Sequence, residues 1–247
     1  MRLSHQKIAV IFQLKLLAIL KNFSIMVAPV TALSFVLLFK TIVPLEPAEA
    51  GVSTPAFILG FSLTFNIVMS GLMMTSQPLA EEKENQTLRV LLSSSVTHGD
   101  FLIGSALPAF LLTTLVNLGL VPLAGTSFQT LSLLPFLMLT SFASLISILF
   151  GLAVGIYAKN QIQASIISFP IIMVLTMIPI FTAFSPDFDR LSHLFYSGIL
   201  IHYINQILLV GHYSWSLTEV ALAFIWLALA GGCLRYTYLR NRQIYAE

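Results

Sequence analysis

The residues of this sequence that are best suited to bind a partner lie in one short polar stretch, residues 78–100, between long apolar runs. Its charged side chains include Glu81, Glu82, Lys83, Glu84 and Arg89. Such side chains form ion pairs with a complementary surface, but a stretch this short cannot fold as a domain of its own. We expect a helical segment on the cytoplasmic side of a membrane that docks on another protein.

The order of residues within this stretch predicts how the segment docks. Pro78 is placed to start a helix, so that the acidic residues occupy its first turns, where the helix dipole favours negative charge. Leu88, Leu91 and Leu92 then fall on one helical stripe, which requires an apolar partner surface. We expect these leucines to dominate docking and the glutamates to set its orientation; the alternative is an ordinary solvated loop. Asp100 is placed to N-cap the next helix.

The elements that must position this stretch are helices that span a membrane. Of the 247 residues, 57% are hydrophobic and only 9% are charged, and the mean hydropathy is +0.92; soluble domains are about 25% charged. The net charge of +2 gives no reason to expect nucleic acid as a partner. Six runs are long enough to cross as helices. They are Ile25–Val43, Pro55–Ser76, Phe101–Ala124, Leu131–Tyr157, Ala164–Phe184 and Leu217–Tyr236. We predict an all-α membrane protein in which residues 1–247 form a single transmembrane domain.

The basic residues predict the orientation of these spans. With six spans and both termini in the cytoplasm, ten of the twelve Lys and Arg residues lie on the cytoplasmic side, and only Lys40 and Arg190 lie outside. This distribution is the one that the positive-inside rule requires. A seventh span at Leu194–Val210 would place the basic C-terminal end outside. We therefore expect a multi-pass protein of the plasma membrane with both termini cytoplasmic.

Two further segments are expected to touch the membrane without crossing it. Leu194–Val210 is apolar but is interrupted by His202, Asn205 and Gln206, so residues 185–214 are expected to form a re-entrant helical element on the outer face.

The other segment is residues 1–22. It is largely apolar, but Lys15 lies in its middle, and a lysine at that position makes a full span expensive. We expect an interfacial helix whose lysines extend towards water.

The polar stretch is similar to a segment of a known family. The sequence EEKENQTLRVLLSSSV at residues 81–96 resembles the segment that follows the second span of ABC-2 type transporter permeases. There, acidic residues precede a Thr-Leu pair, a leucine-rich turn and a tail of small residues, and the order of elements along the whole chain is similar too. The family commonly has Gly where this chain has Gln86, and Pro where this chain has Val96.

The resemblance implies a permease subunit of an ATP-driven exporter that works by alternating access. In that family the segment is a coupling helix that fits a groove of the ATPase subunit. The implied partners are ABC ATPase subunits, which carry ATP and Mg, a second permease subunit in a homo- or heterodimer, and the lipid bilayer. The implied ATPase-coupling residues are Glu81, Glu82, Glu84, Thr87, Leu88, Leu91 and Leu92.

The sequence contains no loop of the kind that cradles the phosphates of a nucleotide. Such a loop is a glycine-rich turn that ends in Lys-Ser or Lys-Thr, and Lys40-Thr41 follows no run of glycines. We therefore expect that this chain is not an enzyme and holds no cofactor of its own, and that ATP is hydrolysed on a partner subunit.

Metal binding and catalysis within the membrane are not predicted either. His193, His202 and His212, with Asp187 and Asp189 nearby, are spaced nine and ten residues apart and match no ligand motif, so interfacial anchoring explains them as well. No Asp, Glu or Lys lies at the centre of a span, which argues against an intramembrane protease and against ion-coupled transport.

Uncharged polar residues within the spans are candidates for lining a translocation pathway. They are Asn66, Asn117, Ser141, Ser144 and Ser147. The three serines recur at a spacing that forms one stripe of a helix; the alternative is close helix packing by small residues. Two other functions stay open from the residues alone: an uncoupled channel-like or secondary transporter, and a non-transporting immunity or scaffold protein of the membrane. The substrate is not predicted.

Overall fold

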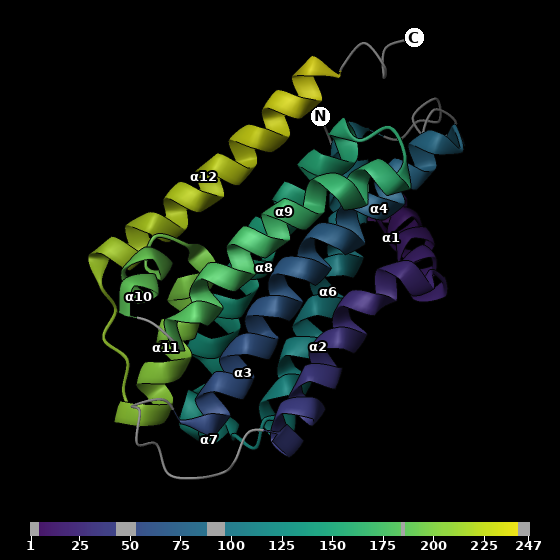
Figure 1. The fold of residues 1–247 in the computed structure, drawn as a ribbon. Helices are drawn as coiled ribbons and strands as arrows, with labels where there is room; N and C mark the ends of the chain where they lie inside the picture. The colour runs from purple at the N-terminus through teal and green to yellow at the C-terminus, as the bar shows by residue number, and fades with distance from the viewer. Residues whose placement is uncertain (1–4, 43–52, 88–96, 184–185, 242–247) are drawn as a thin grey trace.

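The computed structural model describes residues 5–42, 53–87, 97–183 and 186–241, and these residues form a bundle of helices without a strand (Figure 1). The helices are α1 (His5–Lys21), α2 (Phe23–Ile42), α3 (Thr54–Phe65), η1 (Asn66–Ser70), α4 (Gly71–Glu84), α6 (His98–Leu123), α7 (Phe128–Leu131), α8 (Leu133–Tyr157), α9 (Gln161–Ile180), η2 (Phe181–Ala183), α10 (Pro186–Ser192), α11 (Tyr196–Val210) and α12 (Leu217–Arg240).

Six helical runs are long and apolar enough to cross a membrane, which confirms the predicted all-α fold with six spans. They are Phe23–Ile42, Thr54–Glu84, Gly99–Leu123, Leu133–Tyr157, Gln161–Ile180 and Leu217–Arg240. The second run, α3 to α4, has 31 residues. At the rise of an α-helix it is about 46 Å long, whereas the hydrocarbon core of a bilayer is about 30 Å thick. Its last turns are therefore long enough to project beyond the bilayer.

The expectation that Pro78 starts a new helix is wrong. Pro78 lies inside α4, and the helix continues through it to Glu84. The acidic residues consequently occupy the C-terminal end of a helix, where the dipole disfavours negative charge. Asp100 is likewise not the N-cap of α6: Thr97 is the N-cap, and Asp100 closes the capping box as its third helical residue.

The centre of the bundle is the contact of α4 with α8, and small residues make it close. A Cβ added at Gly71 would overlap the side chain of Ser147, and one added at Gly151 would overlap Thr75. Because only glycine allows the two backbones to approach so closely, these positions fix the crossing of α4 and α8.

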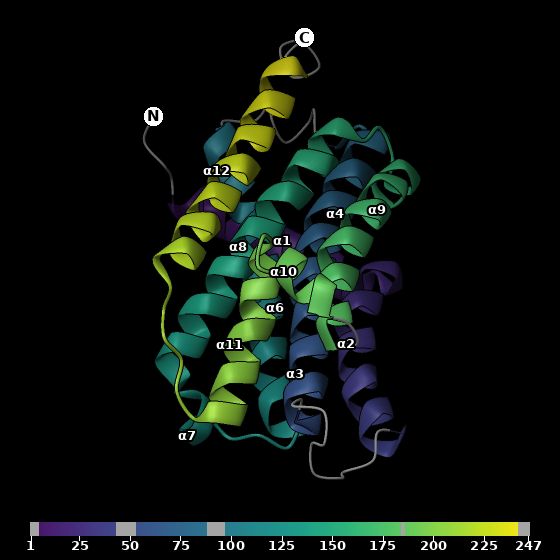
Figure 2. The ribbon, with the colours of Figure 1, turned by 60° about the vertical axis from the view of Figure 1, so that its left-hand side comes forward.

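α1 passes crosswise behind the other helices in the view of Figure 2. It packs mainly against α6, where a Cβ at Gly104 would overlap Ile11. Such an orientation is that expected of a helix along a membrane surface; the interfacial position itself stays a prediction.

α10 and α11 lie in the half of the bundle away from the end of α4 (Figure 2). α11 has 15 residues and is therefore about 22 Å long, which is too short to cross a bilayer. Gly211 ends it in the left-handed conformation, with φ of +84°, and the chain then returns to the start of α12. A re-entrant position in the membrane stays a prediction.

Candidate functional site

The C-terminal end of α4 is joined to α1 by a buried ion pair. The amine of Lys15 lies 2.6 Å from a carboxylate oxygen of Glu82, and the lysine side chain is only 3% exposed. The ammonium also lies 5.0 Å from the ring centroid of Phe101. Burial lowers the pKa of Lys15, and the neighbouring carboxylates of Glu82 and Glu81 oppose that shift. The pair fixes the end of α4 against the crossing helix α1.

The next two charged residues of α4 hold the ends of α8 and α9. The amine of Lys83 donates hydrogen bonds to the carbonyl oxygens of Ile156 and Ala158, both at 2.5 Å. Glu84 accepts a hydrogen bond of 3.3 Å from the backbone N–H of Gln161. A cation thus lies at the C-terminal end of α8 and an anion at the N-terminal end of α9, which is the favourable arrangement for both helix dipoles.

Uncharged polar side chains extend these contacts along α4. The Gln77 amide donates a hydrogen bond of 2.9 Å to the hydroxyl of Ser165. The hydroxyls of Ser76 and Ser168 lie 3.4 Å apart. At the other side, the Asn22 amide lies 3.4 Å from a carboxylate oxygen of Glu81. The end of α4 is therefore bonded to three other helices or their ends: α1, α8 and α9.

α4 ends in a conformation that explains a feature of the sequence. Gln86, two residues after the last residue of α4, has a φ of +58°, which is the left-handed region where glycine is the preferred residue. The permease family that the segment resembles commonly has Gly at this position. Thr87 follows, exposed, and its hydroxyl donates a hydrogen bond of 3.2 Å to the carbonyl oxygen of Glu82.

The expected coupling residues are thus brought together only in part. Glu81, Glu82, Glu84 and Thr87 gather at one end of the bundle. Glu81, Glu82 and Thr87 line a groove of about 520 Å³ between α1 and α4, and Glu84 does not. Lys21, Phe23 and Pro78 line the same groove. Leu88, Leu91 and Leu92 lie outside the described residues, so their docking role stays a prediction.

Two of the expected pathway residues contact each other inside the bundle. The Asn66 amide donates hydrogen bonds to the side-chain oxygen of Asn117 at 2.8 Å and to the carbonyl of Thr113 at 3.2 Å. The Ser70 hydroxyl donates one of 2.9 Å back to Asn66. Asn66 and Ser70 are the first and last residues of η1, a π-helical turn, and such turns often mark functional positions. The amide nitrogen of Asn117 is buried and has no hydrogen-bond partner among the described residues.

The three serines of α8 lie apart from this network. Ser147 shares a hydrogen bond of 2.7 Å with the Tyr196 hydroxyl of α11, and Ser144 donates one of 2.7 Å to the carbonyl of Thr140. Both are fully buried, whereas Ser141 is partly exposed. Within one chain, Ser147 thus joins α8 to α11, whereas the hydrogen bond of Ser144 lies within α8; a role of the five residues in a pathway stays a prediction.

Sequence reasoning missed the residues that receive the charges of α4. Lys15 was assigned to the membrane surface, but it is buried and paired, and a charge inside an apolar run was itself a signal that a partner is needed. Nothing in the sequence marked Gln161 or the carbonyl groups at the end of α8, because backbone groups carry no signature.

Six apolar spans, a helix across their ends and a charged helix end together define a multi-pass helical membrane protein. A family profile described as "ABC-2 family transporter protein" matches residues 8–235 of the chain. The chain therefore belongs to the ABC-2 family of transporter proteins and is a membrane permease of that type. Such permeases are transmembrane subunits, generally non-catalytic, that associate with ABC ATPase subunits. No curated protein sequence matches the chain.

Proposed function

We propose that this permease is the membrane subunit of an ATP-driven exporter and that the end of α4 receives the motion of the ATPase. In this proposal two permease subunits, identical or different, form the pathway between them and alternate between inward and outward access. ATP and Mg are bound by two ATPase subunits, and this chain holds no cofactor for the reaction. The end of α4 faces the cytoplasm.

The observation that carries the proposal is the set of bonds at the end of α4. A force on the chain after Thr87 acts on α1 through Lys15–Glu82, on α8 through Lys83 and on α9 through Glu84. Four helices therefore move with the segment, and a small displacement of it can rock a large part of the bundle.

The groove between α1 and α4 supports the same assignment of partner. It is open and lined by polar side chains, among them Lys21, Asn22, Glu81 and Asn85. Of the three glutamates, Glu84 is the exposed one, so it is the best placed to pair with a basic residue at the rim of the ATPase. Glu82 acts differently, since it orients α1 through Lys15.

Leu88 and Leu91 provide the main test. Burying a leucine is worth about 1.5–3 kcal/mol, whereas an exposed ion pair is worth less than about 1 kcal/mol. In proteoliposomes that contain the chain and its partner ABC ATPase, the double change Leu88→Ala and Leu91→Ala should abolish stimulated ATP turnover or release the ATPase. Glu84→Gln should have a smaller effect.

The control is a second pair of leucines, four residues apart and therefore on one face of a helix. Leu111 and Leu115 lie on the exposed surface of α6, so changing both to Ala should leave ATP turnover and binding of the ATPase intact. Full ATP-dependent transport by the Leu88 and Leu91 double variant would contradict the proposal. Transport without any ATPase would favour the uncoupled transporter.

The orientation is tested by labelling single cysteines in intact cells. Cys233 is exposed and is first changed to Ser. Thr87→Cys should then react only from the cytoplasm, and Ser214→Cys, in the exposed segment before α12, only from outside. Labelling of both from the same side would refute this topology.

A further inference from the structure

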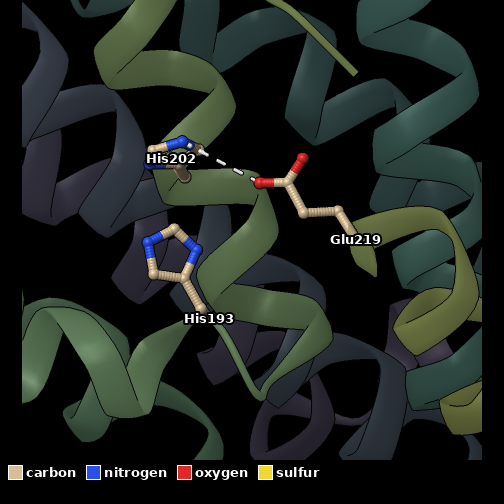
Figure 3. Close-up of side chains that lie close together, drawn as sticks. All are labelled: His193, His202 and Glu219. Atoms are coloured by element: carbon tan, nitrogen blue, oxygen red, sulfur yellow. Dashed lines mark ion pairs between the residues drawn. The ribbon is translucent and has the colours of Figure 1, made fainter. Parts of the chain in front are cut away.

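Three side chains from separate elements converge near the start of α12 (Figure 3). His193 lies between α10 and α11, His202 lies on α11, and Glu219 lies in the first turn of α12. Each offers one ligand atom, and these atoms lie within 4.8 Å of one another. The proposed function uses none of these residues.

The carboxylate of Glu219 is held in place with one oxygen directed at the histidines. Its Oε2 accepts a hydrogen bond of 2.7 Å from the Tyr213 hydroxyl and one of 3.3 Å from the backbone N–H of Ser216. Its Oε1 lies 3.8 Å from Nε2 of His202. The side chain is only 8% exposed, and no lysine or arginine among the described residues forms an ion pair with it. A cation beside a buried carboxylate stabilises its charged form.

The two imidazole rings are arranged to supply the remaining donors. Their centroids lie 4.6 Å apart at an angle of 69°, so the edge of one ring is directed at the face of the other. The Gln206 amide nitrogen lies 2.9 Å from Nε2 of His202. In the tautomer in which Nε2 accepts this hydrogen bond from the amide, Nε2 carries no proton and is in the form that binds metals. Asp189 lies 3.8 Å from His193 and adds negative charge beside it.

We infer that His193, His202 and Glu219 form a binding site for a divalent transition metal, with Zn²⁺ as the best match. Two imidazoles and one carboxylate are a donor set of zinc sites, and a water completes the tetrahedron. Bonds of about 2.0–2.1 Å place tetrahedral ligand atoms about 3.3 Å apart. Side-chain rotations that move the ligand atoms by about 1 Å would therefore bring them to bonding distance of one metal ion. The metal would take the place of the Gln206 amide at Nε2 of His202. The hydrogen bonds of Tyr213 and Ser216 orient the carboxylate, as is usual around ligands.

The site has a structural consequence, because it joins α12 to the rest of the chain. α12 packs mainly against α8 and has few contacts with α11. A metal held by one ligand from α12, one from α11 and one from the turn before α11 would fix the start of α12 to this element. His193 and His202 are 35% and 30% exposed, so the metal can reach its ligands from outside the bundle.

The test measures metal binding by the full chain purified in detergent and stripped with a chelator. Equilibrium dialysis against Zn²⁺, with metal analysis, should give one ion per chain, and Co²⁺ in its place should give the visible absorption of tetrahedral coordination. His202→Ala should lower the affinity at least about tenfold, and so should Glu219→Gln, which preserves the capping box of α12 because Gln serves there as well as Glu.

The matched control is His212→Ala. His212 is exposed, lies close in sequence to the cluster and is not part of it, so its removal should leave binding unchanged. Melting curves without metal establish that each variant is folded, and added Zn²⁺ should raise the melting temperature of the unchanged protein but not that of His202→Ala. The proposal fails if the unchanged protein binds no Zn²⁺ at micromolar concentration, if the His202 and Glu219 variants bind it as tightly, or if His212→Ala weakens it equally.

Discussion

α4 and α12 are both helices of spanning runs, yet they are held in the protein in opposite ways. In the spanning run that contains α4, 72% of the most apolar 18-residue stretch is buried inside the chain, whereas in α12 the corresponding share is 11%. α4 lies between α8 and α9 (Figure 2) and contacts both closely, whereas α12 rests chiefly on α8. One helix is the centre of the bundle and the other is its edge.

Their charged residues differ in the same sense. Glu82 has its cation, Lys15, at 2.6 Å within the same chain, whereas the ion-pair contact of Glu219 among the described residues is longer, 3.8 Å to His202. The charges at the end of α4 therefore have partners within the chain, and in the proposed function they transmit force. The start of α12 holds the carboxylate to which we assign a metal ion from outside the chain. Changes in the two regions should consequently have effects of very different size.

The largest difference is expected between Glu82→Gln and Glu219→Gln. The first leaves Lys15, which is 3% exposed, as a buried charge without its closest partner, and such a loss costs about 3–5 kcal/mol. The second should cost less than about 1 kcal/mol in metal-free protein, because Gln preserves the capping box. Unfolding in detergent, followed by circular dichroism, measures both free energies.

A double variant separates loss of the charge pair from loss of packing. Lys15→Met combined with Glu82→Leu removes both charges and should recover most of the stability that Glu82→Gln loses, since well-packed apolar residues replace buried pairs at little cost. Equal losses in the Glu82 and Glu219 variants would show that the two regions do not differ as described.

Substitutions at two glycines test how closely α4 and α12 are packed. Gly151 lies on α8 where it contacts α4, and Gly232 lies on α12. A Cβ at Gly151 would overlap Thr75 and the backbone of α4, whereas one at Gly232 in α12 would meet nothing within 4 Å. Gly151→Ala should therefore destabilise the protein by about 1–3 kcal/mol. Gly232→Ala should stabilise it by as much as about 1 kcal/mol, because alanine is the better helix former. The melting temperature should fall for Gly151→Ala and rise for Gly232→Ala; shifts of the same sign in both variants would contradict this.

The fold could be predicted from the sequence to the extent that it depends on local composition. The six spans follow from long apolar runs, since lipid leaves a helix as the only single-segment solution. The prediction that a helix starts at Pro78 is wrong. It rests on the preference of proline for the first turn of a helix, whereas Pro78 lies inside α4. In α4 the residues on either side of Pro78 are buried against other helices, and that packing outweighs the loss of one hydrogen bond.

The candidate sites could be predicted only residue by residue. Asn66 and Asn117 were each selected as polar residues in a span, but their contact joins positions 51 residues apart. Lys15 and Glu82 are 67 apart. The histidines were compared with ligand spacings along one segment, whereas Glu219 comes from the following helix. Contacts of this kind depend on which helices become neighbours, and hydropathy does not encode that choice.

The smallest effect is expected at Gln86, where α4 ends. A residue other than glycine in the left-handed conformation costs about 1 kcal/mol, and Gln86 has a φ of +58°. Gln86→Gly should therefore raise the free energy of unfolding by up to about 1 kcal/mol, while Gln86→Val should lower it, because a β-branched residue is a poor fit there. Neither change removes a bond of Lys83 or Glu84 to α8 and α9. Any change in stimulated ATP turnover should therefore come only from a change in the direction in which the chain continues after Thr87. Equal turnover for Gly and Gln, with Val impaired, would mean that the left-handed turn aims the segment at the ATPase; if Gly destabilised the protein and Val did not, α4 would have to end in another conformation.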